Sequence, residues 1–174
     1  MRPQEILNVP KPTWESDEVS MVRDMATKFL EAEIAPNYTN YEKDEIIPRA
    51  QWEKAGANGL LCASVPEEYG GAGGTYAHEA AIIEALGHTG VDGFGIALHS
   101  AIVAPYILNH GSEEQKQKWL PRLATGELIG AIAMTEPAVA SSDVTNIETS
   151  ILRDGDEYVI NGRKWYTSGA MNEN

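Results

Sequence analysis

The sequence predicts an α+β protein, in which an all-helical bundle domain is followed by the opening antiparallel strands of a β-barrel or β-sandwich domain. Two observations support this fold class. Between Ser16 and Glu127, apolar residues recur at helical spacing, and capping residues, prolines and glycines separate the segments. After Leu128, apolar residues alternate with polar ones, and turn pairs that contain glycine divide the chain. Because antiparallel strands follow a helical block, we expect two domains.

The first two helices are expected to follow an N-terminal arm. The first fifteen residues hold three prolines and show no clear period, so we expect them to be extended. Ser16 can cap the first helix, whose apolar residues have helical spacing and which Pro36 is expected to end. Pro48 suits the first position of a second helix, which Gly56 and Gly59 are expected to break.

A glycine-rich loop, residues 70–74, leads into the third helix. Such a loop can bind phosphate, but this one lacks the Lys-Ser/Thr pair of a P-loop and the glycine spacing of a dinucleotide-binding fingerprint. We therefore interpret the loop as a connection. Thr75 can cap the third helix, and Gly87 is expected to stop it.

Two further helices complete the helical region. The fourth is expected over residues 94–108, where Pro105 should kink it or mark its last turn. Ser112 and Gln115 have the spacing of a capping box for the fifth helix, which is expected to end near Gly126.

In addition to an apolar strand that ends before Thr135, the C-terminal segment is expected to form three strands. An alternating pattern over residues 147–151 predicts the first strand. An Asp-Gly pair at 154–155 is a hairpin signal before a second strand at residues 157–160. An Asn-Gly pair at 161–162 is another hairpin signal, before a third strand at residues 164–167.

Charge and composition exclude several classes of function. The chain has 26 acidic and 13 basic residues and a net charge of −13, so it should repel nucleic acid and anionic membranes. Cys62 is the only cysteine, which excludes an intramolecular disulfide and a thiolate metal cluster. The four histidines show no metal-ligand spacing, and His99 is expected to pack or hydrogen-bond between helices. The sequence shows no signal peptide and no apolar run of ~20 residues, so we expect a cytoplasmic protein that does not insert into membranes. We also expect no bound metal.

Residues 130–169 carry the strongest chemical pattern. Thr135 follows an apolar strand and precedes a Glu-Pro pair, and the proline should turn the chain so that backbone N–H groups and the Thr135 hydroxyl lie at a strand end. Such groups can donate hydrogen bonds to a carbonyl-rich heterocycle such as a flavin ring. Ser142 opens another turn, and Tyr166 offers an aromatic face for stacking. The alternative is a simple β-hairpin with surface hydroxyl groups.

A series of short motifs occurs in order along the chain. They are Pro-Glu-Glu-Tyr-Gly-Gly-Ala-Gly-Gly at 66–74, Leu-His-Ser at 98–100, Asn-His-Gly-Ser-Glu-Glu-Gln-Lys at 109–116, Trp-Leu-Pro at 119–121, Gly-Glu at 126–127, Thr-Glu-Pro at 135–137, Ser-Asp at 142–143 and Asn-Gly-Arg-Lys at 161–164. From about Ser16 onward the chain resembles the acyl-CoA dehydrogenases. The helical block with Leu-His-Ser at 98–100 is most like that of the long-chain members, whereas the Ala-Val-Ala-Ser-Ser-Asp turn at 138–143 looks like that of a divergent large-substrate subgroup.

The resemblance implies the fold and the reaction of that family. Its members have an N-terminal helical domain, a middle β domain and a C-terminal helical domain, bind FAD, and form homotetramers or dimers. In fatty acid β-oxidation, a glutamate base removes the α proton of a fatty acyl-CoA, the flavin takes the β hydride, and electron-transfer flavoprotein accepts the electrons. The chain ends at Asn174, short of a full member. The base is therefore expected in the missing C-terminal domain, no catalytic residue is assigned, and the isolated chain is expected to be inactive.

By the same resemblance, the first half of the flavin site comes from one strand and the turns after it. Ile132, Met134 and Thr135 would edge the isoalloxazine ring, with Thr135 in a hydrogen bond to it. Ser142 matches a serine that lies near both the flavin and the CoA part of the substrate. The turn that carries Ser142 is one residue longer than usual and lacks the usual glycines.

The second half of the expected site supplies the stacking residue. Tyr166 aligns without gaps with the position where the family usually has a flavin-stacking Trp. A shift of one residue would put Trp165 there instead. Ser168 takes the place where the family usually has Thr.

The expected organisation is an extended arm (residues 1–15), an N-terminal helical domain (residues 16–127) and a partial middle β domain (residues 128–174). Two alternatives stay open. A non-catalytic helical interaction or assembly fragment could pair with a separate C-terminal half, because an unclosed sheet has edges and an apolar face that need covering. An acyl-CoA oxidase-like flavoprotein would carry similar motifs.

Overall fold

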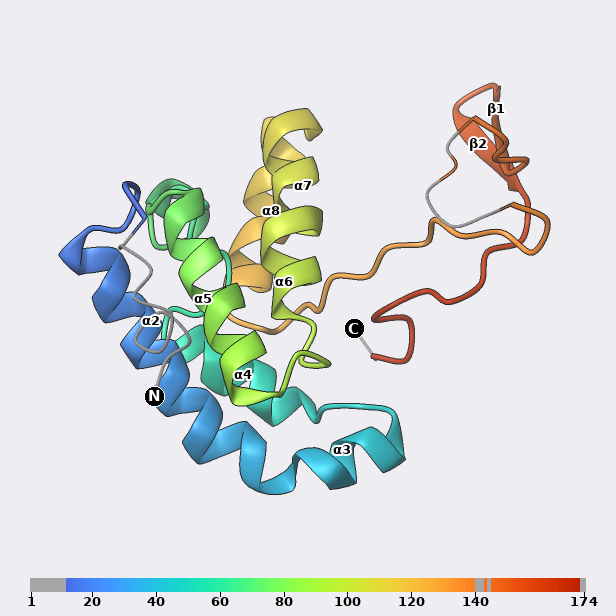
Figure 1. Ribbon diagram of the computed structural model, residues 1–174. Helices are drawn as coiled ribbons and strands as arrows, with labels where there is room; N and C mark the ends of the chain where they lie inside the picture. The colour runs from blue at the N-terminus through green and yellow to red at the C-terminus, as the bar shows by residue number, and fades with distance from the viewer. Residues whose placement is uncertain (1–11, 140–142, 144, 173–174) are drawn as a thin grey trace. The chain divides into compact units, whose positions relative to one another are not determined.

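The structure is a computed structural model, shown in Figure 1. It describes residues 12–139, 143 and 145–172. Residues 1–11, which make up most of the predicted arm, lie outside this described part, and so does the predicted site residue Ser142.

The described residues form two compact units. A helical unit reaches Gly130, and a small β unit runs from Ala131 to Met171. Helices precede antiparallel strands, so the predicted α+β class is confirmed. The elements are α2 (Asp17–Phe29), a π-helical segment (Leu30–Ile34), a 3₁₀ turn (Ala35–Asn37), α3 (Tyr38–Asp44), α4 (Arg49–Ala57), a second 3₁₀ turn (Glu67–Tyr69), α5 (Tyr76–Thr89), α6 (Ile96–Leu98), a second π-helical segment (His99–Val103), α7 (Ala104–His110), α8 (Glu113–Ala124), β1 (Ser150–Asp154) and β2 (Glu157–Asn161).

The first helix begins where the sequence predicts, and a new helical segment follows it at Pro36. The Ser16 hydroxyl caps α2 by accepting a hydrogen bond from the Val19 N–H at 3.2 Å. α2 ends at Phe29 and the π-helical segment after it ends at Ile34, so the helix ends before Pro36 as predicted, although a 3₁₀ turn then leads directly into α3. A π-helical segment precedes this turn, so Pro36 lies in the first turn of a new helical segment, where its missing N–H breaks no intrahelical hydrogen bond.

Gly56 is a packing residue rather than a helix breaker. Pro48 caps α4 instead of filling its first position, and the helix runs through Gly56 to Ala57, which corrects the predicted break. A Cβ at position 56 would lie 2.5 Å from the carbonyl oxygen of Thr125, so only glycine permits this close approach of α4 to the chain after α8. The helix stops before Gly59, whose φ of +68° is left-handed.

The third predicted helix is α5, and it is longer than expected. Thr75 caps it in a capping box with His78, whose Nδ1 accepts the Thr75 N–H at 2.9 Å. The prediction that Gly87 stops the helix is wrong, since α5 reaches Thr89. Gly90 ends it, because the left-handed backbone that a helix C-terminus favours occurs there, at a φ of +69°.

The predicted kink at Pro105 takes the form of a π-helical segment. α6 and α7 belong to one helical run, and His99–Val103 is π-helical immediately before the first turn of α7, which holds Pro105. The run begins at Ile96 and ends at His110. It therefore lies slightly C-terminal to the predicted range of 94–108.

The capping box predicted for the fifth helix is present at the start of α8. The Ser112 N–H donates to Gln115 Oε1 at 2.9 Å, and the Gln115 N–H donates to the Ser112 hydroxyl at 3.2 Å. α8 ends at Ala124, and Gly126 follows with a φ of +79°. A Cβ at position 126 would lie 2.5 Å from the carbonyl oxygen of Trp52, so this glycine also packs against α4.

Buried aromatic and charged groups hold the helical unit together. Trp52 of α4 packs edge-to-face on Phe94, with ring centroids 4.8 Å apart. Arg23 of α2 is buried and forms ion pairs of 2.7 Å with Glu84 of α5 and with Glu15. Because Arg23 is the shared partner of both carboxylates, its loss would leave the buried carboxylate of Glu15 without this counter-charge.

His99 links the π-helical segment to two other parts of the helical unit. Its Nδ1 accepts the Gly130 N–H at 2.9 Å, so Nε2 carries the proton and donates to the Leu123 carbonyl oxygen at 3.0 Å. The ring is fully buried and lies 5.4 Å from the Trp52 ring, centroid to centroid. Burial lowers the pKa of His99 to about 4, which keeps the ring neutral near pH 7. The predicted inter-helix role of this histidine is confirmed.

One hairpin makes up the regular structure of the β unit. β1 and β2 are antiparallel, from Ser150 opposite Asn161 to Asp154 opposite Glu157. The predicted Asp-Gly turn is confirmed, with Gly155 at a φ of +62°. Side chains on both strands are exposed on both faces of this ribbon.

Three strand predictions are wrong. The apolar segment before Thr135 forms an isolated backbone bridge at Ile132 and no strand. The first strand does not include residues 147–149, because the buried carboxylate of Glu136 accepts the N–H groups of Glu148 and Thr149. The Asn-Gly pair at 161–162 does not turn the chain into a third strand at residues 164–167. A Cβ on the glycine of this pair would lie 2.2 Å from Thr149 Oγ1. Glycine at this position therefore allows the chain after β2 to pack closely against the segment before β1.

The burial of neutral His99 makes stability depend on pH. The pKa of His99 is about 4 in the folded chain and 6.5 in the reference state, so the unfolded chain binds the proton more tightly. The contribution of His99 to stability is therefore complete above about pH 6.5 and is lost as the pH falls towards 4. When the pH is lowered from about 7.5 to about 5, the free energy of unfolding should fall by about 2 kcal/mol more in the parent than in the His99→Gln variant, as measured by urea unfolding. Equal losses in the two proteins would contradict a buried neutral histidine.

Two glycine substitutions test the packing role of Gly56. Gly56→Ala should lower the free energy of unfolding by about 1–3 kcal/mol, because the new methyl group would overlap the backbone at Thr125. Gly87→Ala is the matched control in α5. A Cβ there would meet no atom within 4 Å, so helix propensity should raise stability by about 0.5–1 kcal/mol. A neutral Gly56→Ala variant in thermal unfolding would rule out the close approach.

Candidate functional site

Two separate segments of the β unit lie side by side. The Ile132 N–H donates to the Ser168 carbonyl oxygen at 3.3 Å, and the Trp165 N–H donates to the Thr135 carbonyl oxygen at 3.1 Å. The apolar segment before the Thr-Glu-Pro turn is therefore antiparallel to the segment with the two adjacent aromatic residues. The structure brings together the described site residues that the sequence predicts on the two segments.

A hollow of about 620 Å³ lies beside the Thr-Glu-Pro turn. We call it the turn hollow, and Thr135–Val139, Trp165 and Tyr166 line it. The rings of Trp165 and Tyr166 are 5.2 Å apart, centroid to centroid, and are inclined at 49°. Trp165 is 44% exposed and Tyr166 is 82% exposed, so both rings present open faces. Both residues that could serve for stacking thus border the same hollow.

The remaining predicted residues contribute less directly to the turn hollow. Ile132 and Ser168 form the backbone bridge and do not line it. Met134 accepts a hydrogen bond from Lys164 Nζ through its carbonyl oxygen at 3.0 Å. Ser142 lies outside the described residues.

Tyr166 has a backbone conformation that is unusual for its residue type. Its φ of +52° is left-handed, a region that disfavours residues with a Cβ. Holding a non-glycine residue there costs on the order of 1 kcal/mol, and such residues concentrate at ligand-binding and catalytic sites. In this structure the conformation accompanies an aromatic ring that is exposed at the hollow.

The sequence did not indicate the buried carboxylate of Glu136. Its Oε2 accepts the Glu148 N–H at 2.7 Å, and its Oε1 accepts the Thr149 N–H at 3.0 Å and a hydrogen bond from Lys164 Nζ at 2.7 Å. The side chain is only 4% exposed. The Lys164 ammonium and the backbone N–H of Glu148 lower the pKa of Glu136 to about 2. An acidic residue directly before a proline, after an apolar strand, was the only local signal.

Asp143 organises the turn after the Thr-Glu-Pro segment. Its carboxylate accepts the Thr145 hydroxyl at 2.6 Å and the Thr145 N–H at 3.2 Å, and the Asn146 side-chain amide donates to it at 2.7 Å. These hydrogen bonds lower the pKa of Asp143, with that from the Thr145 hydroxyl having the largest effect. The side chain thus makes an Asx turn, which supports the predicted turn at this position.

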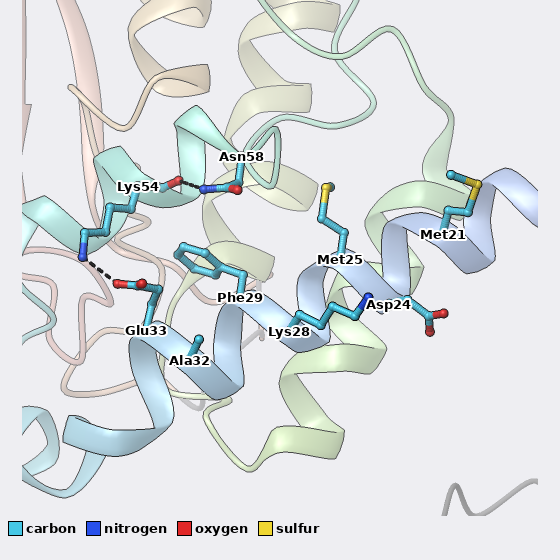
Figure 2. A pocket seen from close by; sticks show the side chains of 9 residues that line it. All are labelled: Met21, Asp24, Met25, Lys28, Phe29, Ala32, Glu33, Lys54 and Asn58. Atoms are coloured by element: carbon cyan, nitrogen blue, oxygen red, sulfur yellow. Dashed lines mark hydrogen bonds and ion pairs between the residues drawn. The ribbon is translucent and has the colours of Figure 1, made fainter.

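A second hollow, of about 730 Å³, lies between α2 and α4 in the helical unit. We call it the α2–α4 groove, and Figure 2 shows the side chains that line it. An ion pair of 2.5 Å between Lys54 and Glu33 spans one end of the groove. Asp24 and Lys28 add one charge of each sign, so the groove favours neither anions nor cations. No described residue that the sequence predicts to bind a ligand lies in it.

The described part of the chain contains no candidate metal site and no helix that could span a membrane. Among residues 12–139, 143 and 145–172, no group of three or more His, Cys, Asp and Glu side chains could hold a metal ion. Within the same residues, no helix has the length and apolar character needed to cross a lipid bilayer.

Comparison with known families identifies both units. Residues 16–127 match the family model described as the acyl-CoA dehydrogenase N-terminal domain, and residues 131–173 match the model of the acyl-CoA dehydrogenase middle domain. The chain belongs to the acyl-CoA dehydrogenase family. The family predicted from the ordered motifs is therefore confirmed.

Individual acyl-CoA dehydrogenases agree with this assignment. The mitochondrial long-chain specific acyl-CoA dehydrogenase of Mus musculus is 40% identical over 159 residues, which cover 91% of this chain and 37% of that protein. The crystal structure of an acyl-CoA dehydrogenase from Geobacillus kaustophilus has a TM-score of 0.83 and 48% identity, covering 90% of this chain and 41% of that one. An acyl-CoA dehydrogenase from Bacillus anthracis complexed with FAD has a TM-score of 0.81 and 35% identity, covering 93% and 28%.

The chain spans only part of the length of these relatives. It covers 37% of the mouse protein and 41% of the Geobacillus kaustophilus structure. In terms of the family's domains, the turn hollow lies within the part that matches the middle domain, and the α2–α4 groove lies within the part that matches the N-terminal domain.

Proposed function

We propose that this chain provides the flavin-facing part of an FAD-dependent acyl-CoA dehydrogenase. The enzyme would oxidise a fatty acyl-CoA to its trans-2-enoyl-CoA in lipid β-oxidation. The observation that carries this proposal is the turn hollow, where a threonine and two aromatic rings meet in a chain of this family. The homologous structure with FAD bound supports the choice of cofactor.

The residues that border the turn hollow suit a flavin ring. Trp165 and Tyr166 offer exposed aromatic faces on which a flat aromatic ring can stack. The hydroxyl of Thr135 can hydrogen-bond a ring carbonyl group. Glu136 also borders the hollow, but its charge is buried and paired with Lys164, so repulsion of an anionic cofactor is reduced.

The chemistry divides between the cofactor and the protein. FAD, when bound, supplies the hydride acceptor for the substrate β carbon. The chain would bind and orient the ring through Thr135 and one of the aromatic residues, with Ile132, Met134 and Ser168 in supporting positions. Ser142 would face both the ring and the CoA part of the substrate. The base that removes the α proton stays a prediction for a C-terminal domain.

The wider context of the enzyme follows from the family resemblance. We propose electron-transfer flavoprotein as the electron acceptor and a homo-oligomer as the assembled form. The cytoplasmic location predicted from the sequence also stays a prediction.

A second candidate function is that of an assembly fragment, which pairs with a separate C-terminal half. The exposed apolar side chains of the β1–β2 ribbon favour it, because such a ribbon is normally covered. These side chains are Ile151, Leu152, Tyr158, Val159 and Ile160. A chain that stays monomeric in analytical ultracentrifugation when mixed with the C-terminal half of a relative would count against it.

Titration of the purified chain with FAD tests the leading proposal. Flavin fluorescence should be quenched saturably as the ring stacks at the turn hollow. Tyr166→Leu and Trp165→Leu should identify the stacking residue, and the more important one should weaken binding by about 3- to 10-fold, as expected for the loss of an aromatic contact. Thr135→Val should also weaken binding, because it removes the hydroxyl at nearly constant volume.

Tyr158→Leu is the matched control for this titration. Tyr158 lies on β2, is 65% exposed and does not line the turn hollow, so its replacement should leave FAD affinity unchanged. An absence of saturable quenching, or equal losses in all the variants, would refute a flavin site at the turn hollow.

A further inference from the structure

Glu136 is the most deeply buried charged group of the β unit in the described residues, and the proposed reaction gives it no part. It is 4% exposed in a unit whose hairpin is otherwise exposed. A carboxylate with so little exposed surface is stable only where hydrogen-bond donors replace water. Three donors surround it: the backbone N–H groups of Glu148 and Thr149, just before β1, and the Lys164 ammonium.

Lys164 connects this carboxylate to the chain on both sides of Thr135. Its Nζ donates to Glu136 Oε1 at 2.7 Å and to the Met134 carbonyl oxygen at 3.0 Å. Thr135 lies between these two anchored residues in the sequence. Trp165 follows Lys164 in the sequence, and its N–H donates to the Thr135 carbonyl oxygen at 3.1 Å. The pair is therefore linked to both chain segments that line the turn hollow.

The geometry leaves little freedom to the residues that face the turn hollow. Residues 134–136 are held through a carbonyl oxygen and a carboxylate, and residues 164–165 through an ammonium and an N–H group. The carboxylate oxygens of Glu136 also accept the N–H groups of Glu148 and Thr149, which links the turn to these two residues. Charge-assisted hydrogen bonds of this kind are shorter and stronger than neutral ones, which suits them to setting a geometry.

We propose that Glu136 and Lys164 are positioning residues, which hold Thr135 and Trp165 at the geometry that the ligand of the turn hollow requires. This inference rests on the proposed flavin-binding function. Neither residue needs to touch the reacting atoms. The pair acts through the backbone, by aligning the Thr-Glu-Pro turn with the aromatic segment before the ligand arrives.

Three variants of the full chain test the role of the pair. Lys164→Met removes the ammonium but keeps the length of the side chain, Glu136→Gln removes the charge at constant shape, and Lys164→Arg restores donors to the same acceptors. Lys116→Met is the matched control. Lys116 is 18% exposed against 21% for Lys164, and it pairs with Glu113 at 2.8 Å on α8, in the helical unit.

Two measurements are made on each protein. Amide hydrogen exchange of the ligand-free chain reports the order of Glu148, Thr149 and Trp165, whose N–H groups donate to the turn. The FAD dissociation constant reports whether that order serves the ligand. Lys164→Met and Glu136→Gln should each speed exchange and weaken FAD binding by about tenfold, the size expected for the loss of a charged hydrogen bond.

Lys164→Arg should recover most of both losses, and Lys116→Met should change neither quantity. Faster exchange with parent FAD affinity would overturn the positioning role, and so would unchanged exchange in Lys164→Met and Glu136→Gln. A parent chain that does not bind FAD would overturn the proposed function instead. In that case the exchange rates of the ligand-free variants still decide whether the pair sets the geometry of the turn.

Discussion

The carboxylate of Glu136 is buried, and a buried charge is stable only where donors surround it. The β unit meets this requirement with the N–H groups of residues 148–149 and the ammonium of Lys164. Because Lys164 also reaches the Met134 carbonyl oxygen, three segments of the chain converge on one charge. The shape of the Thr-Glu-Pro turn, the late start of β1 and the position of the aromatic segment all follow from this one requirement.

The helical unit contains a neutral counterpart of this arrangement. His99 is fully buried, and its two ring nitrogens are satisfied by the backbone at Leu123 and Gly130. Gly130 is the last residue of the helical unit before the β unit begins. In both units, a buried polar side chain therefore fixes the course of the backbone at residues distant in the sequence. Such contacts specify a structure more sharply than apolar burial, because each has a defined direction.

Local signals in the sequence predicted most of the helix starts and the fold class. The caps at Ser16, Thr75 and Ser112 all occur, because a helix N-terminus depends on residues only three positions apart. Predictions from single prolines and glycines were weaker. Pro36 lies in the first turn of a new helical segment instead of leading into a loop, and Gly56 meets the chain near Thr125, far along the sequence. Long-range packing decides these positions, and no local pattern reveals it.

The candidate site shows the same division. The family resemblance indicated Thr135 and the aromatic pair, and the structure places these residues around one hollow. The Glu136–Lys164 pair could not be predicted from spacing, because the partners are separated by 28 residues without a regular strand pairing between them. The sequence pattern assigned Lys164 to an expected third strand of a hairpin. It therefore gave no reason to place Lys164 beside Glu136 at the Thr-Glu-Pro turn.

Amide chemical-shift mapping of the isotope-labelled chain during FAD addition shows which residues the flavin contacts. The saturable shift changes should centre on residues 135–139 and 165–166, which line the turn hollow. The α2–α4 groove should show none, although its volume is similar. Changes that centre on that groove, or that do not saturate anywhere, would contradict the assignment of the flavin site to the turn hollow.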